Sequence, residues 1–394
     1  MPIYLDHAAT TPLRREVLDA MLPYLTDTFG NPSSPHAYGR AARAALDEAR
    51  ERLAASLHAD PREIVLTSGG TESNNLALKG AAWASKARGH RIVTSSVEHH
   101  AVGHALRYLE KFGFEIVELP VDRYGRVDPD QLEAALTDRT ILVSIMLANN
   151  EVGTIQPIGE VIGRVRARSG ILVHVDAVQA APYLDLDVDA LGADLVSIAA
   201  HKFEGPKGAG ALYVRRGTHI LAQQHGGTQE RHRRAGTEDV AAAVGMATAY
   251  ELSTSERAVV SARLRTLRDR LADAILAVDG VELTGHPTER LAGLLSIIAR
   301  GTDGSAVTVA LDLEGIAVST GSACTTGSSE PSHVLAAMGY PDDEARGALR
   351  LSLGRTTTEA DIDTAIEVVP RVLASMRDGA ASIAADPLGE GVGV

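Results

Sequence analysis

The sequence predicts an α/β protein in which a large domain with a mostly parallel β-sheet is followed by a smaller α+β domain. Over the first part of the chain, short apolar runs rich in β-branched residues alternate with helical stretches, a pattern that favours parallel strands joined by crossover helices. After Glu251 the pattern changes to a long helical stretch followed by isolated strands. The 394 residues, 45% of them hydrophobic and 23% charged, suit a globular protein with a large core.

The predicted elements follow from local composition. Strands bounded by glycine or polar residues are expected at 62–67, 91–95, 140–147, 171–176, 195–199 and 210–215. Helices rich in Ala, Leu, Arg and Glu are expected between them at 40–58 and 158–169. In the second unit, a helical pattern runs through Leu276, strands are expected at 294–299 and 349–353, and a final helix at 359–380. Helices between the strands are expected to cover both faces of the sheet.

Charge and cysteine content argue against several classes of protein. The net charge of −13 disfavours extended contact with nucleic acid or an anionic membrane, because clustered Lys and Arg side chains bind such surfaces. No apolar run approaches the ~20 residues of a membrane span. The single cysteine cannot form an intrachain disulfide, and the N-terminus lacks the pattern of a signal peptide. We therefore expect a cytoplasmic protein without direct contact to nucleic acid or membrane.

Cys324 lies in a run of small polar residues, Gly-Ser-Ala-Cys-Thr-Thr-Gly-Ser-Ser, which begins at Gly321. A lone cysteine is most often a small buried hydrophobe. The neighbours of this one favour an exposed loop, although a free thiol is mostly protonated at neutral pH unless a neighbour activates it. From these residues alone, both interpretations stay open.

Three polar segments follow predicted strands. Residues 67–75 contain Gly69 and Gly70 and open a helical stretch, so backbone N–H groups can bind a phosphate there. Asp176 ends a strand, where ligands of parallel sheets bind, and Lys202 lies between a strand end and a Gly-Pro turn. Each segment has a simpler explanation, as a helix cap or a surface charge. Together, however, a phosphate site, an acid for a pyridinium nitrogen and a Schiff-base lysine make a pyridoxal phosphate site.

Nearly the whole chain resembles the cysteine desulfurases of the NifS/IscS type, in the class V aminotransferase family. The resemblance rests on segments in the same order along the chain: 4–12 (Tyr-Leu-Asp-His-Ala-Ala-Thr-Thr-Pro), 30–34, 68–75, 98–102, 148–153, the Asp176 and Lys202 segments, and 321–333. It implies the class V aminotransferase-like variant of the type I fold of pyridoxal phosphate enzymes, with a mostly parallel seven-stranded sheet. It also implies a homodimer, a large cofactor-binding domain at 14–255, and a small domain formed by 1–13 with 256–394 that carries the cysteine loop at about 321–333.

The resemblance implies roles for individual residues. Cys324 is the expected sulfur acceptor, Lys202 the Schiff-base lysine, and His99 the imidazole that stacks on the cofactor ring and moves protons. Asn149 and Arg350 are expected to hold the substrate amino acid, since a guanidinium can grip a carboxylate with two hydrogen bonds. The expected cofactor-binding residues are Gly70, Thr71, His99, Asn149, Asp176, Gln179, Ala200, His201, Lys202 and, from the other subunit, Thr237.

The implied activity is that of a cysteine desulfurase. It takes sulfur from L-cysteine, leaves L-alanine and a Cys324 persulfide, and passes the sulfur to an acceptor protein for iron–sulfur cluster assembly or nucleic-acid thiolation. The alternatives are selenocysteine lyase, another pyridoxal phosphate enzyme of the same fold, and an inactive partner-binding scaffold. A thiol hydrolase that uses Cys324 with a base such as His333 leaves the Lys202 and Asp176 segments unexplained.

Two positions differ from, or add to, the family pattern. The family usually has a serine that donates to the cofactor phosphate where this chain has Ala199, so cofactor binding is weaker unless water or a neighbouring group replaces that hydrogen bond. Glu204 would repel the phosphate if it faced inward, so we expect it to point away.

His100 and His104 have the spacing of helical metal ligands, but no third ligand is evident. We expect no intrinsic metal site, although Cys324 can transiently ligate an iron–sulfur cluster.

Overall fold

A seven-stranded sheet forms the centre of the larger unit, in a computed structural model that describes residues 2–321 and 332–385. The strand order is β2-β8-β7-β6-β5-β3-β4; β8 runs antiparallel to both neighbours, and the other pairs are parallel. This confirms the predicted mostly parallel sheet. The strands are β2 (Ile64–Thr67), β3 (Arg91–Ser95), β4 (Glu115–Leu119), β5 (Thr140–Met146), β6 (Leu172–Asp176), β7 (Leu195–Ala199) and β8 (Gly210–Val214).

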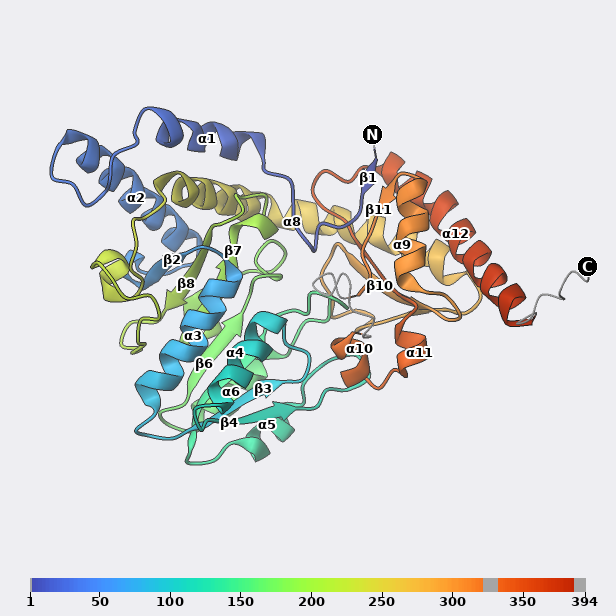
Figure 1. Cartoon of the computed structure of the whole chain (residues 1–394), viewed down its shortest axis with the longest axis horizontal. Helices are drawn as coiled ribbons and strands as arrows, with labels where there is room; N and C mark the ends of the chain where they lie inside the picture. The colour runs from blue at the N-terminus through green and yellow to red at the C-terminus, as the bar shows by residue number, and fades with distance from the viewer. Residues whose placement is uncertain (1, 322–331, 386–394) are drawn as a thin grey trace, which may run out of the picture.

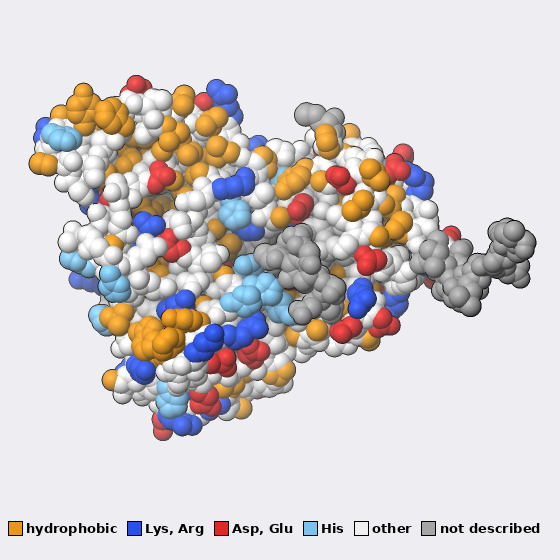
Figure 2. Space-filling model, in the orientation of Figure 1, with side chains coloured by type: hydrophobic (Ala, Val, Ile, Leu, Met, Phe, Trp, Pro, Cys, Tyr) orange, Lys and Arg blue, Asp and Glu red, His pale blue; other side chains and the backbone are white. Residues whose placement is uncertain are grey.

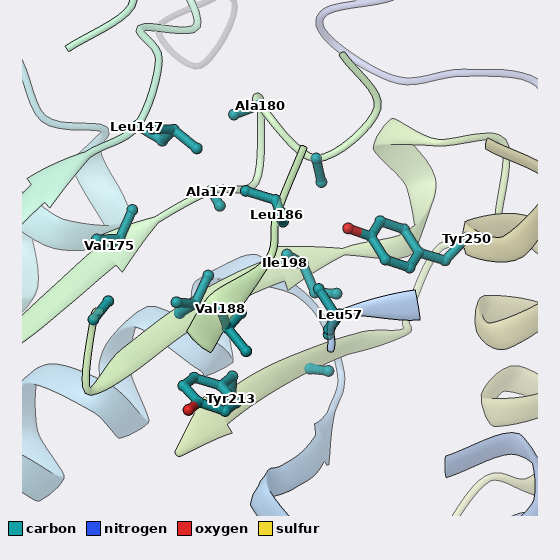
Figure 3. Close-up of a cluster of buried hydrophobic side chains, with 14 of the residues drawn as sticks. Leu57, Leu147, Val175, Ala177, Ala180, Leu186, Val188, Ile198, Tyr213 and Tyr250 are labelled. Atoms are coloured by element: carbon teal, nitrogen blue, oxygen red, sulfur yellow. The ribbon is translucent and has the colours of Figure 1, made fainter. Parts of the chain in front are cut away.

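Helices cover both faces of this sheet (Figure 1). The cluster on one face includes residues of α3 and α4, and the cluster on the other includes residues of α2, α6 and α8. Figure 3 shows part of the second cluster, in which Ile198 of β7 lies near Leu57 and the cluster extends to Val175 of β6 and Tyr250 of α8. The helical segments of this unit are α1 (Arg15–Thr26), α2 (Ala37–Ser56), η1 (Pro61–Glu63), α3 (Gly70–Ser85), α4 (His100–Glu110), α5 (Pro129–Ala135), α6 (Ile158–Arg166), α7 (Val188–Leu191), η2 (Ala200–Lys202) and η3 (Gln229–His232).

The predicted strands agree with the structure to within two residues at either end, while the edge strand β4 was missed. Strands β5, β7 and β8 are buried along their whole length, which is why they read as continuous apolar runs. Strand β4 contains Glu115 and Glu118 and is only partly buried. Because of these polar residues, β4 does not form an apolar run that the sequence would reveal as a strand.

The smaller unit has an antiparallel sheet of order β12-β10-β9 and a parallel pair of β1 with β11. A separate apolar cluster lies between these strands and the helices α8, α9 and α12. Its elements are β1 (Ile3–Tyr4), β9 (Val281–Leu283), β10 (Leu294–Ala299), α9 (Gly304–Leu313), β11 (Ile316–Ala317), α10 (His333–Ala337), α11 (Asp342–Ala345), β12 (Ala348–Ser352) and α12 (Glu359–Ala385).

Helix α8 (Val240–Leu276) connects the two units (Figure 1). Tyr250 in its first half belongs to the large-unit core, and Leu264 in its second half belongs to the small-unit core. The predicted domain boundary after residue 255 therefore falls inside one helix, and the domain limits stay a prediction. Within the described part of the chain, neither α8 nor any other helix combines the length and apolar character needed to cross a bilayer.

Candidate active site

A cavity of about 300 Å³ lies beyond the carboxyl ends of β6 and β7, between the two units. The large unit contributes the strand ends and the first residues of α3 and α4, while the small unit contributes Arg350 and His333. The N-terminal residues Ala8 and Ala9 also line it. The predicted site residues in its wall are Gly70, Thr71, His99, Asp176, Gln179, His201, Lys202 and Arg350.

Asp176, the last residue of β6, holds a buried carboxylate in a fixed orientation. Its Oδ2 accepts from Asn74 Nδ2 at 2.6 Å, and its Oδ1 accepts from the Val178 backbone N–H at 2.9 Å. Burial raises the pKa of this carboxyl group, and the two donors and Lys202 oppose the rise. Such a carboxylate can pair with a cationic ring nitrogen.

Lys202 lies in η2, directly after β7, and its amino group reaches across to the N-terminal segment. Its Nζ donates to the carbonyl oxygens of Ala8 at 2.6 Å and Ala9 at 2.9 Å. That segment is held in turn by Ser352 of β12, whose Oγ accepts from the Ala8 N–H at 2.8 Å. The lysine head group is therefore positioned by residues from both ends of the chain.

His99 caps the N-terminus of α4, and its Nδ1 accepts from the Ala101 N–H at 3.1 Å. Burial, with the nearby charge of Lys202, lowers the pKa of His99 to about 4. The imidazole is therefore neutral at pH 7 and carries its proton on Nε2. Burial also lowers the pKa of His201 to about 4, and its Nδ1 lies 3.2 Å from Thr10 Oγ1.

The backbone at the start of α3 is closely packed and uncapped. Gly69 has φ 144°, and a Cβ added to Gly70 would lie 2.7 Å from Val178 Cγ2. Glycine is thus required for the chain to turn into the helix while packing against Val178. Among the described residues, no side chain caps this helix, so its first N–H groups are available to an anion. Ala199 also lines the cavity but offers no hydroxyl group.

Arg350 of β12 faces the cavity with its side chain almost completely buried. Its Nη1 donates to the Asn150 carbonyl at 2.9 Å, and its Nη2 donates to Asp6 Oδ1 at 2.9 Å. Asp6 was not predicted. The two partners are 344 positions apart, and only the folded chain brings them together.

Asn149 does not line the cavity. Its Nδ2 donates to the Val97 carbonyl at 3.0 Å, and its Oδ1 accepts from the N–H groups of Glu151 at 2.8 Å and Val152 at 2.9 Å. These bonds shape the loop after β5, whose next residue, Asn150, does line the cavity. The expected contact of Asn149 with substrate or cofactor therefore stays a prediction, and the geometry gives its side chain a loop-building role.

Several other predicted residues lie outside this wall. Ala200 is buried at the start of η2 without lining the cavity, and Thr237 is exposed and lines a separate pocket. Glu204 forms an ion pair with Arg355 at 2.6 Å, away from the cavity, which confirms that it points away from the predicted phosphate site. Cys324 lies outside the described residues.

Three further residues line the cavity but were not predicted from the sequence to do so: Glu151, His100 and His333. The rings of His100 and His333 are 4.7 Å apart, and those of His100 and His104 are 5.0 Å apart and stacked. Figure 2 shows histidine side chains gathered in the middle of this face. His333 Nε2 lies 2.9 Å from the Glu98 carbonyl oxygen, to which it donates. Over residues 2–321 and 332–385, no group of three or more His, Cys, Asp or Glu side chains could hold a metal ion.

Comparisons with known proteins agree with this geometry. A family model described as aminotransferase class-V matches residues 3–364. The chain is 50% identical over 376 residues to "Cysteine desulfurase IscS" of Methanosarcina thermophila, covering 95% of this chain and 93% of that protein. A solved "NIFS-LIKE PROTEIN" superposes with a TM-score of 0.90 at 37% identity, covering 95% of this chain and 100% of the other. A structure described as "SspA in complex with cysteine" has a TM-score of 0.80 at 35% identity, covering 90% and 100%. The chain therefore belongs to the aminotransferase class-V family, in its cysteine desulfurase branch.

Proposed function

We propose that the protein binds pyridoxal 5'-phosphate and uses it to take sulfur from L-cysteine, leaving L-alanine and a persulfide on Cys324. The observation that carries this proposal is the meeting, in one cavity, of the α3 N-terminus with Asp176 and Lys202. Each group is ordinary alone. Their combination matches the phosphate, the ring nitrogen and the aldehyde of a single cofactor.

The residues present fit that cofactor. Within the described part of the chain no side chain caps the start of α3, so its first N–H groups can bind a phosphate, and Asp176 offers a buried acceptor to the ring nitrogen. Gln179 lines the cavity, and its amide Nε2 is the atom of this side chain that can donate to the ring oxygen. When bound, the cofactor supplies an electron sink for the substrate carbon atoms.

The chain's own residues bind the substrate and move its protons. Arg350 offers its remaining N–H groups to the substrate carboxylate, and Lys202 and neutral His99 are the groups in the wall that can carry protons. In the balanced reaction, the substrate C–S bond breaks and an S–S bond forms at Cys324. The Cys324 thiol and L-cysteine become a persulfide and L-alanine, and the alanine methyl group takes up the proton.

The persulfide requires a receiver. We propose a sulfur-acceptor protein, such as an iron–sulfur scaffold or a thiolation enzyme, as the partner. The chemistry also favours a reducing compartment, and so the cytoplasm, because the single cysteine must return to the thiol after each cycle. A relative solved with cysteine supports cysteine as the substrate.

We further propose that the protein is a homodimer. Leu22, Leu25 and Phe29, on α1 and just after it, are 51%, 58% and 69% exposed, and Figure 2 shows apolar side chains gathered over this end of the molecule. Contiguous apolar surface of this kind favours a protein interface. Replacing Leu22 and Leu25 together by Glu should shift the mass measured by sedimentation from dimer to monomer.

The proposal is tested on purified protein. We expect a yellow protein whose cofactor absorbance is lost on borohydride reduction, with the cofactor fixed to Lys202 in the peptide mass spectrum. L-cysteine should release L-alanine and add one sulfur to Cys324, and Cys324→Ala should retain the colour but form no persulfide. A colourless protein without bound cofactor would overturn the proposal. Equal turnover of L-selenocysteine by Cys324→Ala, with no release of alanine from L-cysteine by the wild type, would favour a selenocysteine lyase.

A further inference from the structure

Glu151 is an acid in the cavity wall to which the proposed chemistry gives no role. It follows Asn149 and Asn150 in the loop after β5, and its side chain is buried. The same loop holds Arg350 through the Asn150 carbonyl oxygen at 2.9 Å. Glu151 therefore lies in the part of the wall where a substrate carboxylate would be bound.

Within residues 2–321 and 332–385, one side chain donates a hydrogen bond to the buried carboxylate of Glu151. Its Oε2 accepts from the Ser332 hydroxyl group, at the N-cap of α10. A Cβ on Gly321 would lie 3.5 Å from the same oxygen. The ionisable groups that share this cavity are His333 on α10, Arg350 on β12, His201 and Lys202 in η2, Asp176 on β6, His99 at the N-cap of α4 and His100 at its start.

Counting charges around Arg350 shows the difficulty with an ionised Glu151. The guanidinium already forms an ion pair with Asp6 at 2.9 Å, so its positive charge is balanced before substrate arrives. A substrate carboxylate adds one negative charge, and an ionised Glu151 adds another in the same poorly solvated space. Repulsion between like charges is much stronger there than in water. A protonated Glu151 removes this repulsion and also becomes a hydrogen-bond donor.

We propose that Glu151 is a positioning residue that holds a proton while the substrate carboxylate is bound beside Arg350, so that substrate binding is linked to protonation of Glu151. This inference rests on the proposed function, because it needs an amino-acid substrate whose carboxylate meets Arg350. It deepens that function by predicting that the site selects anionic substrates best when its own acid is neutral. Burial raises the pKa of Glu151, and the Ser332 hydroxyl group, His333 and Arg350 oppose the rise.

The test measures L-alanine binding to the holoenzyme, because L-alanine carries the carboxylate and amine of the substrate but no sulfur. The dissociation constant is read from the cofactor absorbance across roughly pH 5 to 9, and proton uptake from calorimetry in buffers of different ionisation enthalpy. Wild type and Glu151→Gln are compared, so titration of the ligand amine and of His99 cancels. Glu110→Gln, an exposed acid on α4, is the matched control.

We expect wild type to take up more protons on binding than Glu151→Gln, by up to about one per site. Above the pKa of Glu151, wild-type affinity should fall relative to the variant by up to about tenfold per pH unit. Equal proton uptake and parallel pH profiles in the two proteins would overturn the inference and leave the proposed function intact. If wild-type holoenzyme does not bind L-alanine at any pH, the proposed function and this inference are both overturned.

A second variant applies if Glu151→Gln does not fold. Ser332→Ala keeps the Glu151 carboxyl group and removes the hydroxyl donor that favours its ionised form. The loss of affinity should then move to higher pH than in wild type. An unmoved profile would contradict the inference, because the group responsible would not be the one that Ser332 contacts.

Discussion

The two walls of the cavity are built in different ways. On the large-unit side, each functional group lies directly at the end of the strand or helix that positions it: Asp176 ends β6, Lys202 follows β7, and Gly70 begins α3. On the other side, Arg350 takes its orientation from Asp6 and from the Asn150 carbonyl oxygen, which belong to distant parts of the chain. The first wall is local in sequence, and the second exists only after folding.

This difference decides what could be predicted from the sequence. A polar residue after an apolar strand is visible in the residues themselves, so Asp176 and Lys202 could be found before the structure. Asp6 gives no such signal, because its partner Arg350 is 344 positions away. The family pattern indicated Asn149 as a site residue. In the structure the side-chain amide of Asn149 forms hydrogen bonds within its own loop, and the next residue, Asn150, lines the cavity. Loop geometry of this kind depends on hydrogen bonds that a linear pattern does not contain.

The largest effect is expected from removing the Lys202 side chain from the large-unit wall. Lys202→Ala removes the amine that would hold the cofactor covalently, so kcat/KM for alanine release should fall by about a thousandfold or more. The absorbance of the lysine-bound cofactor should disappear, while the melting temperature changes little because Lys202 is only partly buried. Lys111→Ala, an exposed lysine at the end of α4, is the matched control and should behave as wild type. Retained activity in Lys202→Ala would show that the cavity is not the reaction site.

A substitution of Arg350 in the small-unit wall should weaken substrate binding and leave cofactor binding unchanged. Arg350→Gln removes a charge-assisted contact to the substrate carboxylate, worth about 1.5–3 kcal/mol, so KM for cysteine should rise roughly 10- to 150-fold. The cofactor spectrum should stay unchanged. Because Asp6 loses its ion-pair partner, the melting temperature should fall, and adding Asp6→Asn should restore part of the stability but not the KM. If the double variant recovered both quantities, Arg350 would be purely structural.

A smaller effect is expected from a substitution in the large-unit wall that strengthens cofactor binding. Ala199→Ser adds a hydroxyl group beside Gly70, where the position of a Gly70 Cβ would lie 3.5 Å from Ala199 Cβ. A new hydrogen bond to a phosphate contributes about 1.5–3 kcal/mol, so the dissociation constant for pyridoxal phosphate should fall by roughly tenfold or more. Ala211→Ser is the control, since Ala211 is buried on neighbouring β8 but does not line the cavity. An unchanged dissociation constant would mean that another group already satisfies the phosphate.

The smallest functional effect is expected behind the first wall, at Glu98. This carboxyl group is buried, and its Oε1 accepts from Ser95 Oγ at 2.5 Å and from the Met146 N–H at 3.0 Å. Burial raises the pKa of Glu98 from 4.5 to about 8, with the negative charge of Asp176 adding to the rise. The group is therefore neutral at pH 7, and Glu98→Gln, a neutral side chain of the same shape, should leave kcat/KM at that pH near the wild-type value.

Stability, in contrast, should depend on pH differently in the two proteins. Between pH 4.5 and about 8, folded wild type keeps the Glu98 proton that the unfolded chain has lost, so this group's contribution to stability falls as pH rises, by about 1.4 kcal/mol per unit. Above about pH 8 both states are ionised and the fall ends. Glu98→Gln has no proton to lose. The difference in melting temperature between this variant and wild type should therefore grow in favour of the variant from pH 5 to 8 and stay constant above pH 8. A constant difference across the whole range would show that Glu98 is ionised in the folded protein, and that the wall near Asp176 carries two negative charges rather than one.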